Sequence, residues 1–385
     1  MITANSPILE QIRMDGMHEI LSSPGPSITV ILPPCRPGEL AATSAALLKV
    51  QVHHAERLLA ERGVSETEAA DLLAPLQYLT EDTTLFSGSQ WGRAIFRSPT
   101  VYRHFQVMQP IRAKLTVASC FAIRALLPEL SLPSEFYVLE LSKKRISLLR
   151  CTPFHATPVG LPEGVPQTLE EALQLEAPDH DLENRSFAGT SMGAMRAVRF
   201  GTGSGRETQH AHLGDFYKLV DRGMRKLLHG GGTPLVLAGV DEDTALYRSI
   251  SACPTLVPDS IHGSPTVSTQ EAEIVRKGYA LIHAECVDRE IKAWIEAKER
   301  LAPARFSTEL RDILRAAFEG RVMSLSIDET ARRTGEFAMG EYRSWGTEDL
   351  LNLAAVQTIL HNGKVVGMPN DRLPGGAAVA AQLRF

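Results

Sequence analysis

A short apolar run, residues 234–240, constrains the fold of this chain more than any other feature. It follows a segment with helical spacing that begins near Leu213 and ends at three glycines, residues 230–232. A continuous apolar run between turn signals is typical of a buried parallel strand. Upstream, apolar runs at 136–141 and 145–149 are separated by a short basic turn, which predicts a β-hairpin. Strand, helix and strand in this order imply a βαβ crossover, so we predict an α/β fold.

The length of 385 residues exceeds what one hydrophobic core usually organises, so several domains are expected. Leu132-Pro133-Ser134 and the segment that ends at Pro254 carry the boundary signals. We therefore predict an N-terminal α/β domain at residues 1–131, a central domain at 132–250 and a C-terminal α/β domain at 251–385.

Each predicted domain combines helices and strands. In the N-terminal domain we expect strands at 27–32, 83–86, 92–96 and 101–107, helices at 39–62 and 69–79, and a connector at 110–130. In the central domain we expect an irregular stretch at 152–193. In the C-terminal domain we expect helices at 270–300 and 308–318, a helix from Thr347 as N-cap to Gly363 as C-cap, and strands at 322–327, 364–368 and 378–385.

Composition excludes several classes of protein. With 44% hydrophobic and 22% charged residues and no run of apolar residues long enough to cross a membrane, the chain is expected to be cytoplasmic, with no membrane partner. The formal net charge of −5 means that any RNA contact must come from local basic patches. The five cysteines are scattered, so neither a disulfide framework nor a zinc ribbon is indicated. We expect no metal and no cofactor.

A glycine-rich segment ahead of the central helix is the main candidate site. Its alternating glycines can take conformations that other residues avoid, and a glycine-rich approach to a helix start suits an anion. It could equally be a surface turn, a contact for RNA, or a catalytic tip. The candidate residues are Arg196, Arg199, Gly201, Gly203, Ser204, Gly205, Arg206 and Gln209.

Two further groups of charged residues are candidates for a site. The basic hairpin turn Lys143, Lys144 and Arg145 could contact RNA or simply be solvated. Glu140 and the acidic residues at 241–243 are too sparse to predict the two-metal site of a nuclease, and an acidic helix start explains the second group better.

Several blocks of this sequence are similar to those of the bacterial branch of the archaeo-eukaryotic peptide-chain release factor family, whose relatives include the eukaryotic class-one release factor and pelota. These blocks lie at residues 27–34, 136–142, 235–241, 348–356 and 373–376. The resemblance implies a central ribonuclease-H-like domain and a C-terminal α/β/α domain akin to ribosomal proteins that bind kinked RNA. True release factors carry a Gly-Gly-Gln tip where this chain has Gly201-Thr-Gly-Ser-Gly205.

The resemblance implies a ribosome-associated protein acting in translation termination, ribosome rescue or a stress response, with the glycine loop toward tRNA or rRNA. Because the Gly-Gly-Gln tip is absent, peptidyl-tRNA hydrolysis stays open and no catalytic residue is predicted. The alternatives are a peptidyl-tRNA ester hydrolase that uses the glycine loop, and a non-catalytic module that binds a protein through its N-terminal domain.

Overall fold

The structure is a computed structural model of the chain, and its residues form two compact units. Unit 1 consists of residues 1–132 and 283–385, and unit 2 consists of residues 133–282. The structure describes residues 10–11, 14–34, 41–81, 91–108, 111–142, 145–175, 204–263, 271–338, 341–369, 372–373 and 376–385. The predicted strand at 83–86 therefore lies outside the described residues.

The N-terminal part of unit 1 contains a five-stranded sheet with the strand order β1-β4-β3-β2-β5. The strands are β1 (Glu10–Gln11), β2 (Ser27–Leu32), β3 (Gly92–Arg97), β4 (Tyr102–Val107) and β5 (Lys114–Ala118). The predictions for β2, β3 and β4 are confirmed. β5 lies in the segment that was predicted to be a connector, because this edge strand buries only Val117 and so carries a weak apolar pattern.

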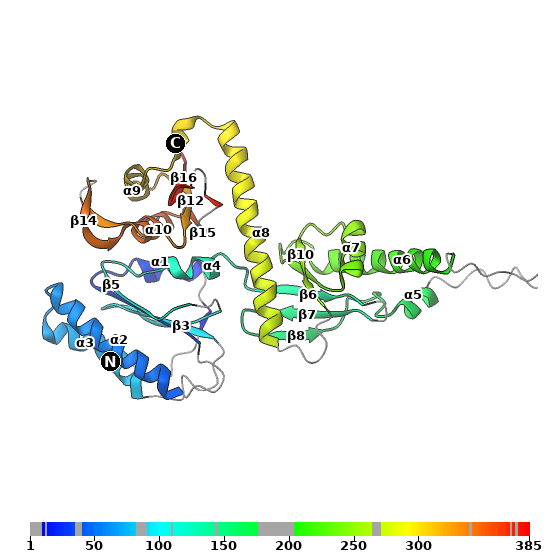
Figure 1. Ribbon diagram of the computed structural model, residues 1–385, viewed down its shortest axis with the longest axis horizontal. Helices are drawn as coiled ribbons and strands as arrows, with labels where there is room; N and C mark the ends of the chain where they lie inside the picture. The colour runs from blue at the N-terminus through cyan, green and yellow to red at the C-terminus, as the bar shows by residue number, and fades with distance from the viewer. Residues whose placement is uncertain are drawn as a thin grey trace, which may run out of the picture. The chain divides into compact units, whose positions relative to one another are not determined.

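One face of this sheet is covered by two helices, α2 (Ala41–Glu61) and α3 (Glu66–Glu81) (Figure 1). Their apolar side chains share a core with the strands, as the predicted helical spacing requires. α3 continues through Pro75, so the proline does not end the helix. The opposite face of the sheet packs against α1 (Met14–Leu21) and the segment that contains the 3₁₀ turn η2 (Arg124–Leu126) and the short helix α4 (Leu127–Leu130).

The buried imidazole of His104 in β4 is expected to make the free energy of unfolding depend on pH. Its side chain is buried beside Tyr102, and burial, with a smaller contribution from Arg93, lowers its pKa from 6.5 to about 4. The unfolded chain therefore takes up a proton below pH 6.5 that the folded chain resists until about pH 4. We expect the free energy of unfolding to fall by about 2 kcal/mol between pH 7 and pH 5 through this group alone.

Urea unfolding at the two pH values checks this expectation. The variant His104→Gln should lose that part of the pH dependence, whereas His53→Gln, which changes an exposed histidine on α2, should keep it. An unchanged pH dependence in His104→Gln would show that His104 is protonated equally in both states.

The C-terminal part of unit 1 contains a second sheet with the strand order β11-β16-β12-β15. Helices pack on both faces of this sheet. Its elements are β11 (Phe306–Ser307), α9 (Leu310–Phe318), β12 (Val322–Asp328), α10 (Leu350–Leu360), β15 (Lys364–Met368) and β16 (Val379–Leu383), together with the second half of α8 (Glu271–Arg300). The predicted helices and strands of this region are confirmed. A short 3₁₀ turn, η3 (Pro303–Arg305), precedes β11.

Three details of this part differ from the predictions. The N-cap of α10 is Asp349, whose side chain accepts a hydrogen bond from the backbone of Asn352, and not Thr347. Thr347 instead belongs to a hairpin of β13 (Thr334–Ala338) and β14 (Glu341–Asp349) that the sequence did not predict. α10 ends at Leu360 with His361 as its C-cap in place of Gly363, and Asn362 takes a left-handed conformation.

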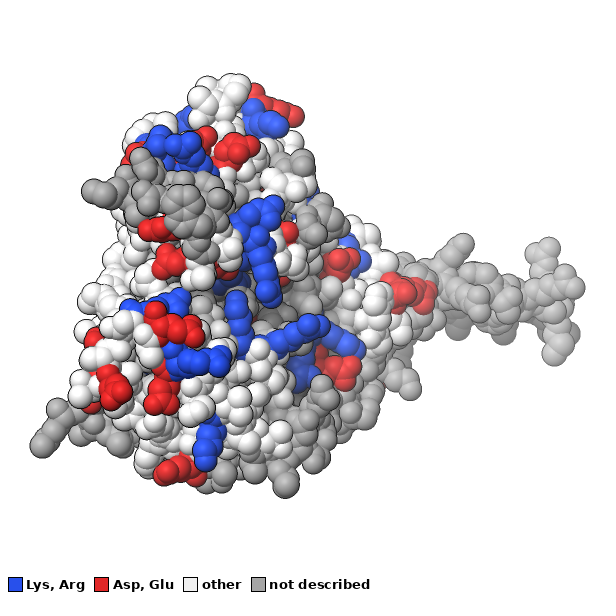
Figure 2. All heavy atoms as spheres, turned by 60° about the vertical axis from the view of Figure 1, so that its left-hand side comes forward, with Lys and Arg blue, Asp and Glu red and all other residues white. Residues whose placement is uncertain are grey.

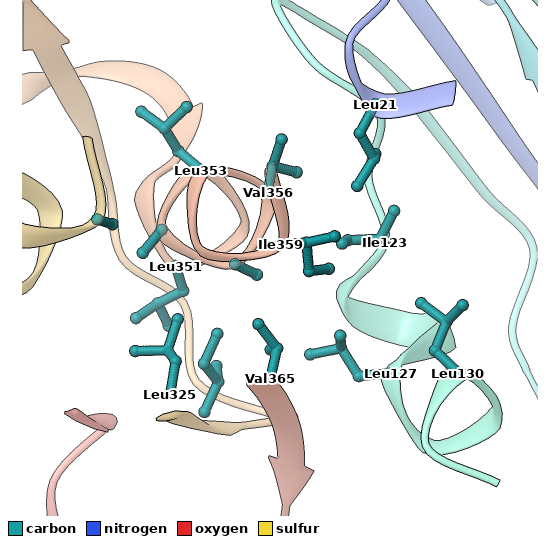
Figure 3. Packing of buried hydrophobic residues seen from close by; sticks show 14 of the residues in the cluster. Leu21, Ile123, Leu127, Leu130, Leu325, Leu351, Leu353, Val356, Ile359 and Val365 are labelled. Atoms are coloured by element: carbon teal, nitrogen blue, oxygen red, sulfur yellow. The ribbon is translucent and has the colours of Figure 1, made fainter. Parts of the chain in front are cut away.

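A single apolar core joins the two parts of unit 1. Figure 3 shows Leu127 and Leu130 of α4 on one side, facing Ile359 of α10 and Val365 of β15 on the other. Leu127, Leu351 and Leu325 are completely buried. Residues that are far apart in the sequence therefore stabilise one another, and unit 1 is expected to unfold as one cooperative structure.

Unit 2 is built on a five-stranded sheet with the order β10-β9-β6-β7-β8. Its elements are β6 (Phe136–Glu140), β7 (Ser147–Cys151), β8 (Ala156–Val159), α5 (Leu169–Leu175), α6 (Ser204–Leu227), β9 (Leu235–Gly239), α7 (Asp241–Ile250), β10 (Leu256–His262) and the first half of α8. β6 and β7 pair antiparallel, which confirms the hairpin, and β9 lies parallel to β6, which confirms the βαβ crossover. The α/β fold class is thereby confirmed.

The structure of unit 2 contains elements that the sequence analysis does not predict. The stretch predicted to be irregular contains β8 and α5, whose short lengths leave little periodicity to read. β10, which follows the predicted boundary at 250, pairs with β9 and extends the same sheet. The division into domains at 131 and 250 stays a prediction.

Candidate functional site

The glycine-rich segment lies at the start of α6. Arg196, Arg199, Gly201 and Gly203 lie outside the described residues. The backbones of Ser204, Gly205, Arg206 and Gln209 are helical, so the helix begins before Gly205 and not after it as the spacing of apolar residues predicted. The backbone N–H groups of the first helical turn therefore come from the glycine-rich segment itself, which suits an anion ligand.

The rest of α6 is held firmly in unit 2. Phe216, Tyr217, Val220 and Met224 are almost completely buried in the core beneath the sheet. Gly223 leaves room for Val165, because a Cβ atom at this position would come 2.1 Å from the Val165 Cγ2 atom. α6 is therefore anchored in unit 2, and it fixes the position of the end of the glycine-rich segment.

A buried carboxylate ties α6 to the helix that follows β9. Asp221 is 3% exposed, and its oxygens accept hydrogen bonds from Ser251 Oγ at 2.5 Å, the Ala252 backbone at 3.2 Å and Arg225 Nε at 3.0 Å. Tyr247 donates a longer bond of 3.4 Å to the same group, and burial raises the pKa of Tyr247. Since Asp221 has this full set of partners, its role is to hold α6 against the turn after α7.

The second predicted RNA contact is the turn between β6 and β7. Lys143 and Lys144 lie outside the described residues. Arg145 is exposed, and its Nη2 atom donates a hydrogen bond of 3.3 Å to Gln167 Oε1. The described part of this turn thus offers one exposed guanidinium group, which a neighbouring side chain orients.

The acidic residues considered for a nuclease site have structural partners. Ser147 donates a hydrogen bond to Glu140, and Asp241 lies 2.7 Å from His262 Nδ1. Asp241, Glu242 and Asp243 form the first turn of α7, as predicted for an acidic helix start. Within the described ranges, no group of three or more His, Cys, Asp and Glu residues could hold a metal ion.

Sequence reasoning missed a cluster of cations in unit 1. Burial lowers the pKa of Lys114 at the start of β5, with smaller contributions from Arg124 in η2 and Arg332 ahead of β13, and Asp349 opposes the shift. These residues come from segments that are distant in the chain and carry no shared motif, so the sequence holds no signal that would join them.

The family comparison matches most of unit 2 and the beginning of the region that follows it. Residues 135–321 match the family described as bacterial archaeo-eukaryotic release factor family 3. This range contains the sheet of unit 2, α6, α8, β11 and α9. Residues 135–321 therefore belong to the bacterial archaeo-eukaryotic release factor family. The match confirms the family resemblance of the blocks at 136–142 and 235–241, and it indicates a release-factor-like translation factor. The blocks at 27–34, 348–356 and 373–376 lie outside the matched residues.

Solved structures give distant matches to this release-factor-family chain. An archaeal translation termination factor, aRF1, is 12% identical with a TM-score of 0.25 and covers 97% of this chain and 99% of its own. Pelota of Archaeoglobus fulgidus is 14% identical with a TM-score of 0.38, covering 77% and 80%. Dom34 of S. cerevisiae is 9% identical with a TM-score of 0.32, covering 79% and 81%. At these values none of them assigns an activity to this chain.

A comparison with curated protein sequences finds no match. No helix within the described ranges has both the length and the apolar character that a membrane span requires.

Proposed function

We propose that this protein binds the ribosome in the cytoplasm and acts in translation termination, ribosome rescue or a stress response. The observation that carries the proposal is the family match of residues 135–321, the region that contains α6 and its glycine-rich start. In this proposal the segment from Arg196 to Gln209 contacts tRNA or rRNA. Phosphates would be bound by the arginines and by the free N–H groups at the start of α6.

The structure supports a docking role for this segment. α6 is fixed at its far end by the buried Asp221 network and along its length by core packing, so a ligand held at its start has a defined position. No described residue near α6 favours hydrolysis over binding. Peptide release is therefore not part of the proposal.

Sedimentation with purified bacterial ribosomes and their subunits tests this function. The protein is expected in a ribosomal fraction, and the triple variant Arg196→Ala, Arg199→Ala, Arg206→Ala is expected to bind at least about tenfold more weakly, because three phosphate contacts are lost. Absence of the unaltered protein from every ribosomal fraction, including stalled ribosomes, would contradict the proposal.

A matched variant controls for net charge. Lys49→Ala, Arg57→Ala, Arg62→Ala removes three exposed cations from α2 and its C-terminal turn, and it should sediment like the unaltered protein. If both triple variants weaken binding equally, the contact depends on total charge and the role of the glycine-rich segment is wrong.

A further inference from the structure

A cavity of about 160 Å³ lies in unit 1, between the second half of α8 and the C-terminal sheet. The side chains that line it belong to α8, β12, β15 and the segment after β15, and they are Ile291, Trp294, Ile295, Ser326, Met368 and Arg372. Every one of them is part of unit 1. The cavity is therefore independent of the glycine-rich segment, which belongs to unit 2.

Small residues on the sheet leave this space open. Ile291 of α8 packs against a cluster that contains Met368 and Ala380, so the helix rests on the sheet at this level. One turn further along α8, Trp294 lines the cavity from the helix, and Ser326, which pairs with Ala380 of β16, lines it from the sheet. A serine beside an alanine supplies too few atoms to fill the space next to an indole ring. Because protein interiors are otherwise close-packed, the cavity results from the side chains that meet here.

The indole that forms one wall is fixed by its own neighbours. The Phe306 ring meets the Trp294 ring edge to face, with ring centroids 5.5 Å apart and an angle of 70° between the ring planes. Lys298 Nζ lies 5.1 Å from the centroid of the Trp294 ring. These contacts hold Trp294 in place without a ligand, so the cavity is formed in advance and binding requires little ordering of side chains.

Ser326 gives the cavity a polar group that can bind a ligand. The residue is 3% exposed and lines the cavity, and its hydroxyl makes no hydrogen bond to another residue in the described part of the chain. A buried hydroxyl without a partner is unfavourable, because it has given up its hydrogen bonds to water. A ligand whose own hydroxyl group reached Ser326 would restore such a bond.

The charged groups next to the cavity have partners of their own. Arg372 forms an ion pair with Asp288, and the Lys298 ammonium lies over the Trp294 ring. Apart from Ser326 and Arg372, the lining side chains are aliphatic, aromatic or thioether groups. A charged ligand would exchange its hydration for these apolar walls at a high cost in free energy, so the cavity favours an uncharged ligand.

The surroundings of the cavity differ from a protein interface. Past Ile295, which is 50% exposed, α8 continues with Glu296, Lys298, Glu299 and Arg300, all of which are exposed. Figure 2 shows acidic and basic side chains next to one another at the top of unit 1. A stable protein interface buries about 800 Å² on each partner, and its core is depleted of charged residues. An isolated apolar cavity in such a surface therefore fits a small molecule better than a protein.

We propose that this cavity binds a small uncharged compound with one six-membered ring and a hydroxyl group, of which phenol is the simplest example. Apolar cavities of about 150 Å³ accept a single benzene ring, so the volume here suits one such ring. The ring packs among Ile291, Trp294 and Met368, and the ligand hydroxyl bonds to Ser326.

Titration of phenol against the full chain, followed by saturation-transfer NMR, tests this site. Phenol is expected to bind, and benzoate should bind at least about tenfold more weakly, because its carboxylate would lose hydration. Ser326→Ala should weaken phenol binding about fivefold and leave toluene binding unchanged, since only phenol can bond to the hydroxyl. A merely structural role of Ser326 would change the binding of both ligands alike.

Two variants fill the cavity. Ser326→Leu on the sheet and Ile295→Trp at a half-exposed position of α8 should each weaken phenol binding at least about tenfold. Lys292→Trp is the matched control, because Lys292 is exposed on the same helix and does not line the cavity, and it should bind phenol like the unaltered protein. Thermal unfolding shows which variants are folded, and Ile295→Trp keeps the test valid if Ser326→Leu is not.

Several results would overturn this proposal. They are absence of phenol binding, equal binding of benzoate, phenol binding that survives in every folded variant with a filled cavity, and equal weakening in Lys292→Trp. An equal loss of phenol and toluene binding in Ser326→Ala would remove the hydroxyl contact. Self-association of the unaltered protein that Ile295→Trp abolishes would assign the cavity to a second copy of the chain. None of these results depends on ribosome sedimentation, so the proposed function is tested separately.

Discussion

Replacing Asn352 with alanine is expected to lower the free energy of unfolding of unit 1 by roughly 4 kcal/mol. Asn352 is 4% exposed, and its Oδ1 atom accepts hydrogen bonds from the backbones of Ile123 at 2.8 Å and Arg124 at 3.3 Å. Its Nδ2 atom donates to the Phe121 carbonyl at 2.9 Å. Alanine would leave these backbone groups buried without partners, which costs more than the loss of the bonds themselves.

Tryptophan fluorescence during urea unfolding is the appropriate measurement. All three tryptophans, Trp91, Trp294 and Trp345, belong to unit 1, so the signal reports on this unit. Gln357→Ala is a matched control, because Gln357 lies on the same helix and is only half-buried. A loss of stability no larger than that of the control would mean that water or a shifted backbone satisfies the groups around Asn352.

Leu127→Ala is expected to destabilise unit 1 by about 3 kcal/mol, because it opens a cavity in the core that joins the two sheets. The Leu127 side chain is completely buried and faces the C-terminal sheet through α10 and β15 (Figure 3). Although Leu127 belongs to the N-terminal part of the chain, the C-terminal sheet should lose stability equally, since both parts share one core.

Hydrogen exchange followed by mass spectrometry can separate the two sheets. Amides of β3 and of β12 should lose protection together in the Leu127 variant, while Val50→Ala, an exposed position on α2, should leave both unchanged. Loss of protection in β3 alone would show that the two parts unfold independently, and the single core would then be the wrong description.

The glycine-rich segment shows why a correct local pattern can misplace a boundary. The sequence located the helix through its buried face, from Leu213 onward, and this face is buried as predicted. The first turns of α6 are made of polar and small residues, so the apolar pattern in the sequence begins later than the helix does. The same limit applies to β8 and α5, which are too short for a period to be visible.

The candidate site was predictable only in part. The glycines and arginines of residues 196–209 stand together in the sequence, so their composition could be read directly. The contact network that fixes α6, centred on Asp221, was not foreseen because Ser251 and Ala252 belong to a later turn. The cations around Lys114 were also missed, since the chain brings them together only by packing two sheets on one core.

By itself, the sequence determined the α/β fold class, the hairpin of β6 and β7, the parallel strand β9 and the family, because these depend on local apolar periodicity and on short blocks of residues. Only the tertiary structure decided that residues 1–132 and 283–385 form one unit and that Arg124, Asn352 and Asp349 meet at its junction. The physical reason is that burial and hydrogen bonding between segments distant in the chain depend on how whole sheets pack, and no local spacing of residues records that packing.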